Sequence, residues 1–110
     1  MATLSNLYVD QGSTYSSIIT VTSSTGSALD LTNYSVASQM RKSHKSSTYH
    51  SFTASVYDAT NGKIRLQLTD EQSGAIPEGR WLFDVEIESP AGVRTRVLEG
   101  VVTVTPEITR

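Results

Sequence analysis

The stretch that decides the fold is residues 79–105, GRWLFDVEIESPAGVRTRVLEGVVTVT. Four large apolar residues recur in it at every second position: Trp81, Phe83, Val85 and Ile87. Because successive side chains of an extended strand point to opposite faces, all four lie on one side. Three carboxylates alternate with them on the other side: Asp84, Glu86 and Glu88. With turn residues at 89–92, the pattern predicts a β-hairpin with one apolar and one acidic face.

The second strand of this hairpin offers partners for two of the carboxylates. If residues 89–93 form the loop, three cross-strand pairs follow: Glu88 with Arg94, Glu86 with Arg96, and Val85 with Val97. A loop shorter by one residue would turn both arginines toward the apolar face, so the charges help to fix the register. Opposite charges across a ladder contribute about 0.2–1 kcal/mol each. We therefore predict that Glu86, Glu88, Arg94 and Arg96 form structural charge pairs.

Two other interpretations of the acidic row stay open. Clustered carboxylates can bind calcium, but neighbouring residues on one face of a strand lie about 6–7 Å apart. That spacing is too wide for one ion without ligands from a loop. The row can also belong to a protein interface. A solvated face that pairs its own charges is the interpretation we prefer, and we expect no metal and no cofactor.

Beyond Val97 the alternation slips by one residue. An apolar face continues through Leu98, Gly100, Val102 and Val104, whereas Glu99 joins the polar face. A β-bulge near residues 98–100 explains the slip. The alternative is that both faces are covered there, one of them by a neighbouring subunit. On that alternative, and with both chain ends added, the candidate interface residues are Leu98, Val102, Val104, Pro106, Ile108, Arg110, Leu4 and Leu7.

Composition narrows the class of protein. A chain of 110 residues is long enough for a modest core, and we expect a single domain over residues 1–110. It has no cysteine, and a net charge of −2 with acids and bases interspersed argues against binding to nucleic acid. No apolar run approaches the about 18 residues of a membrane span, and the first residues lack signal-peptide features. The 16 serines and 14 threonines fit strands and turns with a polar exterior.

Shorter alternating runs predict the remaining strands. They cover residues 4–9, 14–22, 34–40, 52–56 and 64–68, with a short extended piece at 29–33. Asn61-Gly62 is turn chemistry and joins two of these runs into a second hairpin. Thr69 and Gln72 match a capping box for one helical turn, with Gly74 as its left-handed stop. The result is an all-β fold: an antiparallel immunoglobulin-like β-sandwich of about seven short strands with one short helical turn.

Other clusters give little support for catalysis. Residues 41–45, RKSHK, are the main basic cluster and predict a solvated loop, or else contact with an acidic protein surface. Nucleic-acid stacking is disfavoured because no aromatic residue is interleaved with these charges. His44 and His50 fit no zinc spacing and are expected to be exposed loop residues. Without a Gly-x-Ser-x-Gly elbow or a glycine-rich phosphate loop, we predict that the protein is not an enzyme.

Four segments together resemble one known family. They are residues 9–15 (VDQGSTY), 26–34 (GSALDLTNY), 79–87 (GRWLFDVEI) and 96–107 (RVLEGVVTVTPE). The set resembles the small immunoglobulin-like β-sandwich module of tailed-phage virion proteins and is similar to the N-terminal domain of baseplate upper proteins. Free-standing versions resembling the whole chain occur as small structural proteins of marine tailed phages.

This resemblance implies a non-enzymatic virion component. It would be made in the host cytoplasm and would assemble with copies of itself and with tail, baseplate or capsid proteins, with head or tail location left open. Neither nucleic acid nor membrane is expected as a partner. We expect docking by strand edges and by the chain ends, residues 1–6 and 106–110. Deleting residues 106–110 should leave the fold intact and impair assembly.

A second hypothesis is a module that binds glycans on the host surface. Sites of this kind present exposed aromatic rings, and the candidates are Tyr8, Tyr49 and Tyr57. The alternative is that these tyrosines cover the ends of the sandwich and keep their hydroxyls in water.

Overall fold

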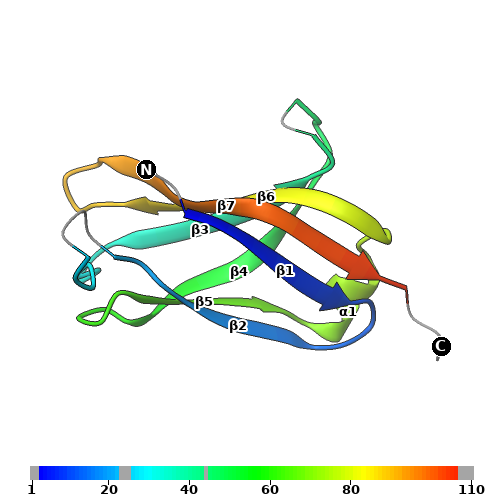
Figure 1. Ribbon diagram of the computed structural model, residues 1–110, viewed down its shortest axis with the longest axis horizontal. Helices are drawn as coiled ribbons and strands as arrows, with labels where there is room; N and C mark the ends of the chain where they lie inside the picture. Colours follow the sequence, from blue (N-terminus) through cyan, green and yellow to red (C-terminus); the bar gives the residue numbers. More distant parts are fainter. Residues whose placement is uncertain (1–2, 23–25, 44, 107–110) are drawn as a thin grey trace.

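The computed structural model describes residues 3–22, 26–43 and 45–106, and these form seven strands and one short helix (Figure 1). The strands are β1 (Thr3–Asp10), β2 (Tyr15–Thr20), β3 (Ser35–Arg41), β4 (Tyr49–Asp58), β5 (Lys63–Leu68), β6 (Gly79–Glu88) and β7 (Arg94–Thr105), and the helix is α1 (Asp70–Gly74). The prediction of an all-β fold with one helical turn is confirmed.

The seven strands form one sheet in the order β1-β7-β6-β3-β4-β5-β2. Strand β4 joins its two halves, because residues 49–52 pair with β3 and residues 53–58 pair with β5. Figure 1 shows the sheet curling over, with β7 and β6 across from β5 and β2. Phe52 contacts both Tyr15 and Phe83, at ring-centroid distances of 5.8 and 6.2 Å. The sheet is therefore nearly closed into a barrel, with β1 and β2 as its two edges.

One pairing departs from the predicted antiparallel arrangement. β1 runs parallel to β7, from Thr3 opposite Leu98 to Asp10 opposite Thr105, whereas the other five strand pairs are antiparallel. The entirely antiparallel arrangement is therefore wrong. The apolar alternation of β1 suits either direction, and its direction is set instead by the chain's course. After the turn at residues 11–13, the chain must continue into β2 on the opposite edge of the sheet.

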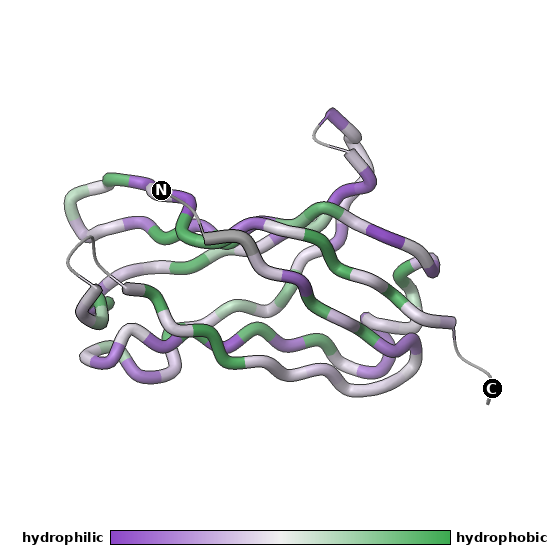
Figure 2. The backbone as a smooth tube through the Cα atoms, viewed as in Figure 1, coloured by the Kyte–Doolittle hydropathy of each residue, from purple (hydrophilic) through white to green (hydrophobic). Residues whose placement is uncertain are grey.

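Alternate side chains of the strands fill the interior of the curled sheet. Figure 2 shows the alternation of hydrophobic and hydrophilic residues along them. The large side chains that are essentially inaccessible to solvent are Val9, Leu31, Met40, Ile64, Leu66, Leu68, Ile76, Val85, Val102 and Val104. Full burial of an aliphatic side chain of this size contributes about 1.5–3 kcal/mol, so this interior is the main source of stability.

The hairpin of β6 and β7 confirms most of the predicted register. Glu88 lies opposite Arg94, and Glu86 lies opposite Arg96. Val85 pairs with Leu98 rather than with Val97, because Val97 is an extra residue in the ladder. The predicted bulge therefore exists, one residue before the range 98–100. It restores the phase that points Leu98 into the core.

The second predicted hairpin and the helix start are also confirmed. Gly62 lies at φ 66° in the β4–β5 turn, and a Cβ there would lie 2.6 Å from the carbonyl oxygen of Val21. Thr69 Oγ1 accepts from the Gln72 N–H at 3.1 Å, and Gln72 Oε1 accepts from the Thr69 N–H at 2.8 Å. The predicted left-handed stop at Gly74 is wrong. Its φ is not positive, and the capping residue Ala75 remains right-handed.

Candidate functional site

The outer faces of β3, β6 and β7 form a groove of about 490 Å³. Its polar lining comes from alternate positions of the three strands and from the start of the following loop: Gln39, Arg41, Ser43, Asp84, Glu86, Arg96 and Glu99. Leu82 and Val101 contribute half-buried apolar surface. A hollow of about 370 Å³ adjoins the groove and shares Gln39, Asp84 and Glu86 with it. Leu82 and Val101 lie side by side in the row that begins with Arg41, so the groove combines an apolar patch with polar neighbours, as protein interfaces do.

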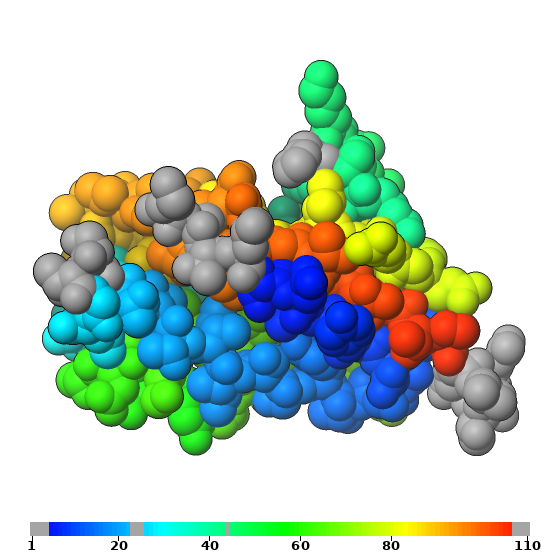
Figure 3. Space-filling view, viewed as in Figure 1, coloured from blue at the N-terminus to red at the C-terminus, as the bar shows by residue number. Residues whose placement is uncertain are grey.

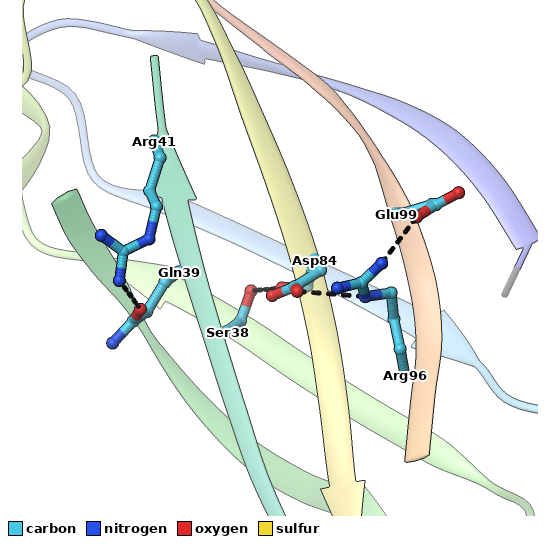
Figure 4. Close-up of polar contacts among 6 residues, drawn as sticks. All are labelled: Ser38, Gln39, Arg41, Asp84, Arg96 and Glu99. Carbon is cyan, nitrogen blue, oxygen red and sulfur yellow. Dashed lines mark hydrogen bonds and ion pairs between the residues drawn. The ribbon is translucent and has the colours of Figure 1, made fainter. Parts of the chain in front are cut away.

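Arg96 lines the groove on its β7 side and binds two carboxylates there. Its Nε lies 3.2 Å from Asp84 Oδ2, and its Nη1 lies 3.3 Å from Glu99 Oε2 (Figure 4). The predicted pairing with Glu86 is therefore correct as register but wrong as an ion pair. The bulge at Val97 turns Glu99 onto the same face as Arg96 and places it opposite Asp84, so Arg96 binds the two carboxylates of the neighbouring row instead of Glu86. Within the described residues, Glu86 has no ion-pair partner.

Arg41 holds the opposite end of the groove. Its guanidinium donates to the Ser46 carbonyl oxygen at 2.7 Å and to Gln39 Oε1 at 3.1 Å. It also lies 4.7 Å from the ring centroid of Tyr49. Between the two ends, Ser38 Oγ donates from the core side of β3 to the Asp84 carbonyl oxygen at 2.6 Å, as Figure 4 shows. These contacts fix the shape of the groove before any partner binds.

The described residues of the β3–β4 loop, 42–43 and 45–48, stand clear of the body (Figures 1 and 3), and Ser43 at the start of the loop lines the groove. Lys42 Nζ lies 4.8 Å from the centroid of the Trp81 ring and 3.4 Å from the Arg80 carbonyl oxygen. Lys45 is exposed and has no ion pair within the described residues. The basic cluster is thus only partly the free, solvated loop that we predicted.

The two histidines of the prediction separate. His50 lies within β4, is half-buried and meets the Trp81 ring edge-on at 5.2 Å, so its prediction as an exposed loop residue is wrong. His44 lies outside the described residues. No group of three or more His, Asp or Glu residues in the described ranges could hold a metal ion.

The two edge strands carry little that would block pairing with another chain. Neither β1 nor β2 contains proline, and neither ladder has an irregularity. Asp10 is the only charged residue in either strand, and its Oδ1 accepts from Thr105 Oγ1 at 2.6 Å. Tyr8 on β1 is 68% exposed, and Ile18 on β2 is 46% exposed. A cleft of about 410 Å³ lies where β2 approaches the first residues of β7.

Four of the eight predicted interface residues are buried in the core. Leu7, Leu98, Val102 and Val104 are buried in the core of the single chain, which leaves them no surface to offer a partner. For these four the prediction does not hold, because their face of β1 and β7 lines the interior of the curled sheet. Pro106 is exposed just after β7. The backbone of Leu4 belongs to β1, and Ile108 and Arg110 lie outside the described residues.

The predicted ion pair between Glu88 and Arg94 is confirmed, and the three candidate tyrosines are exposed, as predicted. Arg94 Nη2 lies 3.0 Å from Glu88 Oε1. Tyr8, Tyr49 and Tyr57 are all exposed. The Arg65 guanidinium lies 4.5 Å from the centroid of the Tyr57 ring, much as Arg41 does at Tyr49. Each of these two rings therefore has one face already occupied.

Sequence reasoning missed the apolar floor of the groove. Leu82 interrupts the polar row of β6, and Val101 directly precedes the inward-facing Val102. Both departures from alternation are visible in the sequence and could have marked a second, outward-facing apolar patch.

The groups with shifted pKa values lie away from the groove. Burial raises the pKa of Tyr15 on β2. Hydrogen bonds from Thr32 lower the pKa of Asp30, and the Asn61 side chain is the main cause that lowers the pKa of Asp58. All three shifts have local structural causes, in a turn or in the core. Within the described residues, no helix has the length and apolar character needed to cross a membrane.

No protein-family model matches the chain, and no curated protein matches it. Among solved structures, the chain is similar to the Listeria monocytogenes internalin-like protein lmo2027, with 13% sequence identity and a TM-score of 0.49. The superposition covers 94% of this chain and 28% of that protein, so the chain spans less than a third of its length. A similarity of this size does not bear on function.

Proposed function

We propose that this protein is a non-enzymatic structural component of a tailed-phage virion that docks on other virion proteins through its edge strands. The observation that carries the proposal is the pair of unprotected edges, β1 and β2. Proteins that act alone usually protect such edges with lysine, proline or a bulge, because unpaired N–H and C=O groups template pairing with another chain. Strands β1 and β2 contain no lysine, proline or bulge, and Asp10 is their only charged residue.

A strand added to either edge would gain main-chain hydrogen bonds and local apolar contact. On β1 the added strand would cover Tyr8, and on β2 it would cover Ile18. The cleft between β2 and the start of β7 would receive its inward-facing side chains. Addition of a strand to an exposed edge is a common mode of protein recognition.

The resemblance of residues 9–15, 26–34, 79–87 and 96–107 to tailed-phage virion modules supports the assignment to a virion. We further propose that the curled sheet is a variant of the immunoglobulin-like sandwich of that family, in which β4 bridges the two layers. The partners would be tail, baseplate or capsid proteins and further copies of the chain. The protein would be made in the host cytoplasm and reside in the particle.

Charging the edges tests this function. Asn6→Lys on β1 and Ser16→Lys on β2 place a lysine on an exposed position of each edge. Gln67→Lys is the matched control, because Gln67 lies directly beside Ser16 but on β5, where Ser16 of β2 and Thr53 of β4 pair with it on both sides. With tagged variants in purified particles, we expect several-fold lower incorporation of an edge variant and normal incorporation of the control. Wild-type incorporation of both edge variants would contradict the proposal.

The end of the chain gives an independent test. β7 ends at Thr105, and Pro106 is exposed beyond it. Removing residues 106–110 should therefore leave the melting temperature nearly unchanged while lowering incorporation into particles. Equal incorporation of truncated and full-length protein would remove the chain end from the proposed docking surface.

A host-glycan-binding module is the second candidate function, favoured by the three exposed tyrosines. Tyr8 presents the most accessible ring, whereas Tyr49 and Tyr57 each have a guanidinium over one face. The ring of Tyr8 and the uncovered faces of Tyr49 and Tyr57 can stack on sugar rings. A glycan array with purified protein would support this candidate if retention is lost in Tyr8→Ala, and no retention on any glycan would dispose of it.

A further inference from the structure

We propose that the groove on β3, β6 and β7 binds the β3–β4 loop of a second copy of this chain, with Lys45 of each copy pairing with Glu86 of the other. The inference rests on the proposed assembly function and names one of its partners as the chain itself. It uses a different surface from the edge strands, so each proposal can fail independently of the other.

The charge pattern of the groove leaves one carboxylate uncompensated. Asp84 and Glu99 share Arg96, and Arg41 is committed to Gln39, Ser46 and the Tyr49 ring. Glu86 remains without an ion-pair partner within the described residues and lines both the groove and the hollow that adjoins it. The groove is therefore complementary to a single cationic side chain that arrives where the groove meets the hollow.

Glu86 is also accessible to a partner from the β3 side. Its neighbour across the β3–β6 ladder is Ala37, whose methyl group leaves space beside the carboxylate. The apolar surface of Leu82 and Val101 lies in the same groove. A partner that contacts both would combine a charge pair with apolar burial, and the burial is needed because one exposed ion pair contributes only about 0.2–1 kcal/mol.

The β3–β4 loop has the matching chemistry. The described part of the loop stands clear of the body (Figure 3), and Lys45 within it is exposed. Its base is held on one side by Lys42 against the Trp81 ring and on the other by the hydrogen bond from Arg41 to Ser46. A loop fixed in this way loses less conformational entropy when it binds.

The position of loop and groove predicts the symmetry of the pair. Arg41 and Ser43 line the groove and are also the residues at which the loop begins, so the two features adjoin on one face. A two-fold axis beside the loop therefore places each loop over the groove of the other copy. Each charge contact then occurs twice, as in the closed two-fold dimers that are the commonest oligomers.

Charge exchange tests this arrangement. Lys45→Glu sets two carboxylates against each other at both contacts of its homodimer, and Glu86→Lys sets two ammonium groups against each other. Each variant alone should dimerise about tenfold or more weakly than the wild type, which corresponds to about 1.4 kcal/mol. In an equimolar mixture, each mixed dimer has two contacts. One joins the unchanged Lys45 of one copy to the unchanged Glu86 of the other, and the second joins the two substituted side chains, a glutamate and a lysine. Each contact therefore brings opposite charges together. Its affinity should return to the wild-type range. Sedimentation equilibrium over a concentration series measures all four samples.

Controls and outcomes separate this inference from a general charge effect and from the proposed function. Glu78→Lys makes the same charge change at an exposed position outside the groove and should dimerise like the wild type.

A monomeric wild type at millimolar concentration, open-ended growth in mass, or no recovery in the mixture would each overturn the inference. If those results appear while Asn6→Lys still lowers incorporation, the proposed function stands without it. If instead the loop-exchanged dimer forms and both edge variants are incorporated normally, the inference stands and docking through the edge strands fails.

Discussion

Arg96 on β7 binds Asp84 on β6 at 3.2 Å, although the residue that faces it across the ladder is Glu86. The cause is the bulge at Val97, which places a third carboxylate, Glu99, within 3.3 Å of the same guanidinium. Arg96 therefore sits between Asp84 and Glu99 and leaves Glu86 available. The position of one extra residue in β7 thus decides which carboxylate of the outer face can meet a partner.

We expect Arg96→Ala to lower the free energy of unfolding by about 0.5–1 kcal/mol, because partly exposed ion pairs are weak and two are lost at once. Arg94→Ala is the matched comparison and should cost less. It removes one pair with Glu88, and its side chain is 67% exposed against 48% for Arg96. Urea unfolding at low and high salt measures both, and the Arg96 effect should shrink in salt. A larger loss from Arg94→Ala would contradict the shared-pair geometry.

Gly100 of β7 is paired with Ser5 of β1 and has no room for a side chain. A Cβ on Gly100 would overlap the carbonyl oxygen of Ser5, so alanine cannot be accommodated unless β1 moves. We expect Gly100→Ala to destabilise the protein by about 1–3 kcal/mol, as overpacking does. Loss of amide-exchange protection confined to β1 would show that the parallel pairing is what suffers.

Gly74→Ala is the control for this substitution. The nearest atoms to a Cβ at Gly74 lie 3.8 Å away, and its φ is not positive. Alanine there restricts the unfolded chain without strain in the fold, so stability should stay unchanged or rise by up to about 1 kcal/mol. Equal destabilisation by the two substitutions would show that the contact between Gly100 and Ser5 is not the cause.

Local signals account for the parts of the fold that the sequence predicts well. The β6–β7 register follows from alternation and from arginines that cannot face the core, and the α1 start follows from Thr69 and Gln72. The parallel partner of β1 could not be predicted, because it joins residues as distant as Thr3 and Leu98 and nothing in the alternation of β1 specifies direction.

The candidate surfaces were harder to predict for a related reason. Val102 and Val104 were candidates for a subunit contact because the slip in alternation left open that both faces of the segment are covered, but the curled sheet encloses them. Their neighbour Val101 faces the groove instead. The alternation placed Val102 and Val104 on one apolar face, but whether the interior of the same sheet or a second subunit covers that face depends on how the sheet curls, which the local pattern does not specify.

The capping box at the start of α1 should be measurable although the helix has only five residues. Thr69 Oγ1 accepts from the Gln72 N–H, and the Gln72 side chain returns a bond to the Thr69 N–H. We expect Thr69→Ala to lower the free energy of unfolding by about 1 kcal/mol, the usual cost of losing an N-cap. Thr69→Ser keeps the hydroxyl and should retain most of that stability. If serine costs as much as alanine, the hydroxyl is not the stabilising group.

Asp58 should make folding sensitive to acid. The Asn61 side chain donates to Asp58 Oδ2 at 2.8 Å and is the main cause that holds the pKa of this carboxyl below its ordinary value of 3.8. A pKa that is lower in the folded state contributes stability above the unfolded-state value, and that contribution disappears as pH falls through the folded-state value. Asp58→Asn should therefore be less stable than the wild type at pH 7. The difference in free energy of unfolding should shrink toward about pH 2, where residue 58 becomes uncharged in the wild type as it is in the variant.

Asn61→Ala tests the same bond from the donor side. It removes the hydrogen bond to Asp58 and leaves the carboxyl in place, so the acid sensitivity due to that bond should fall in this variant as well. If Asn61→Ala also destabilises the β4–β5 turn itself, that loss of folding free energy should be the same at every pH. It can therefore be separated from the pH-dependent loss. Urea midpoints measured between pH 2 and pH 7 decide the matter. Parallel curves for the wild type and both variants would show that the bond between Asn61 and Asp58 does not couple this turn to protonation.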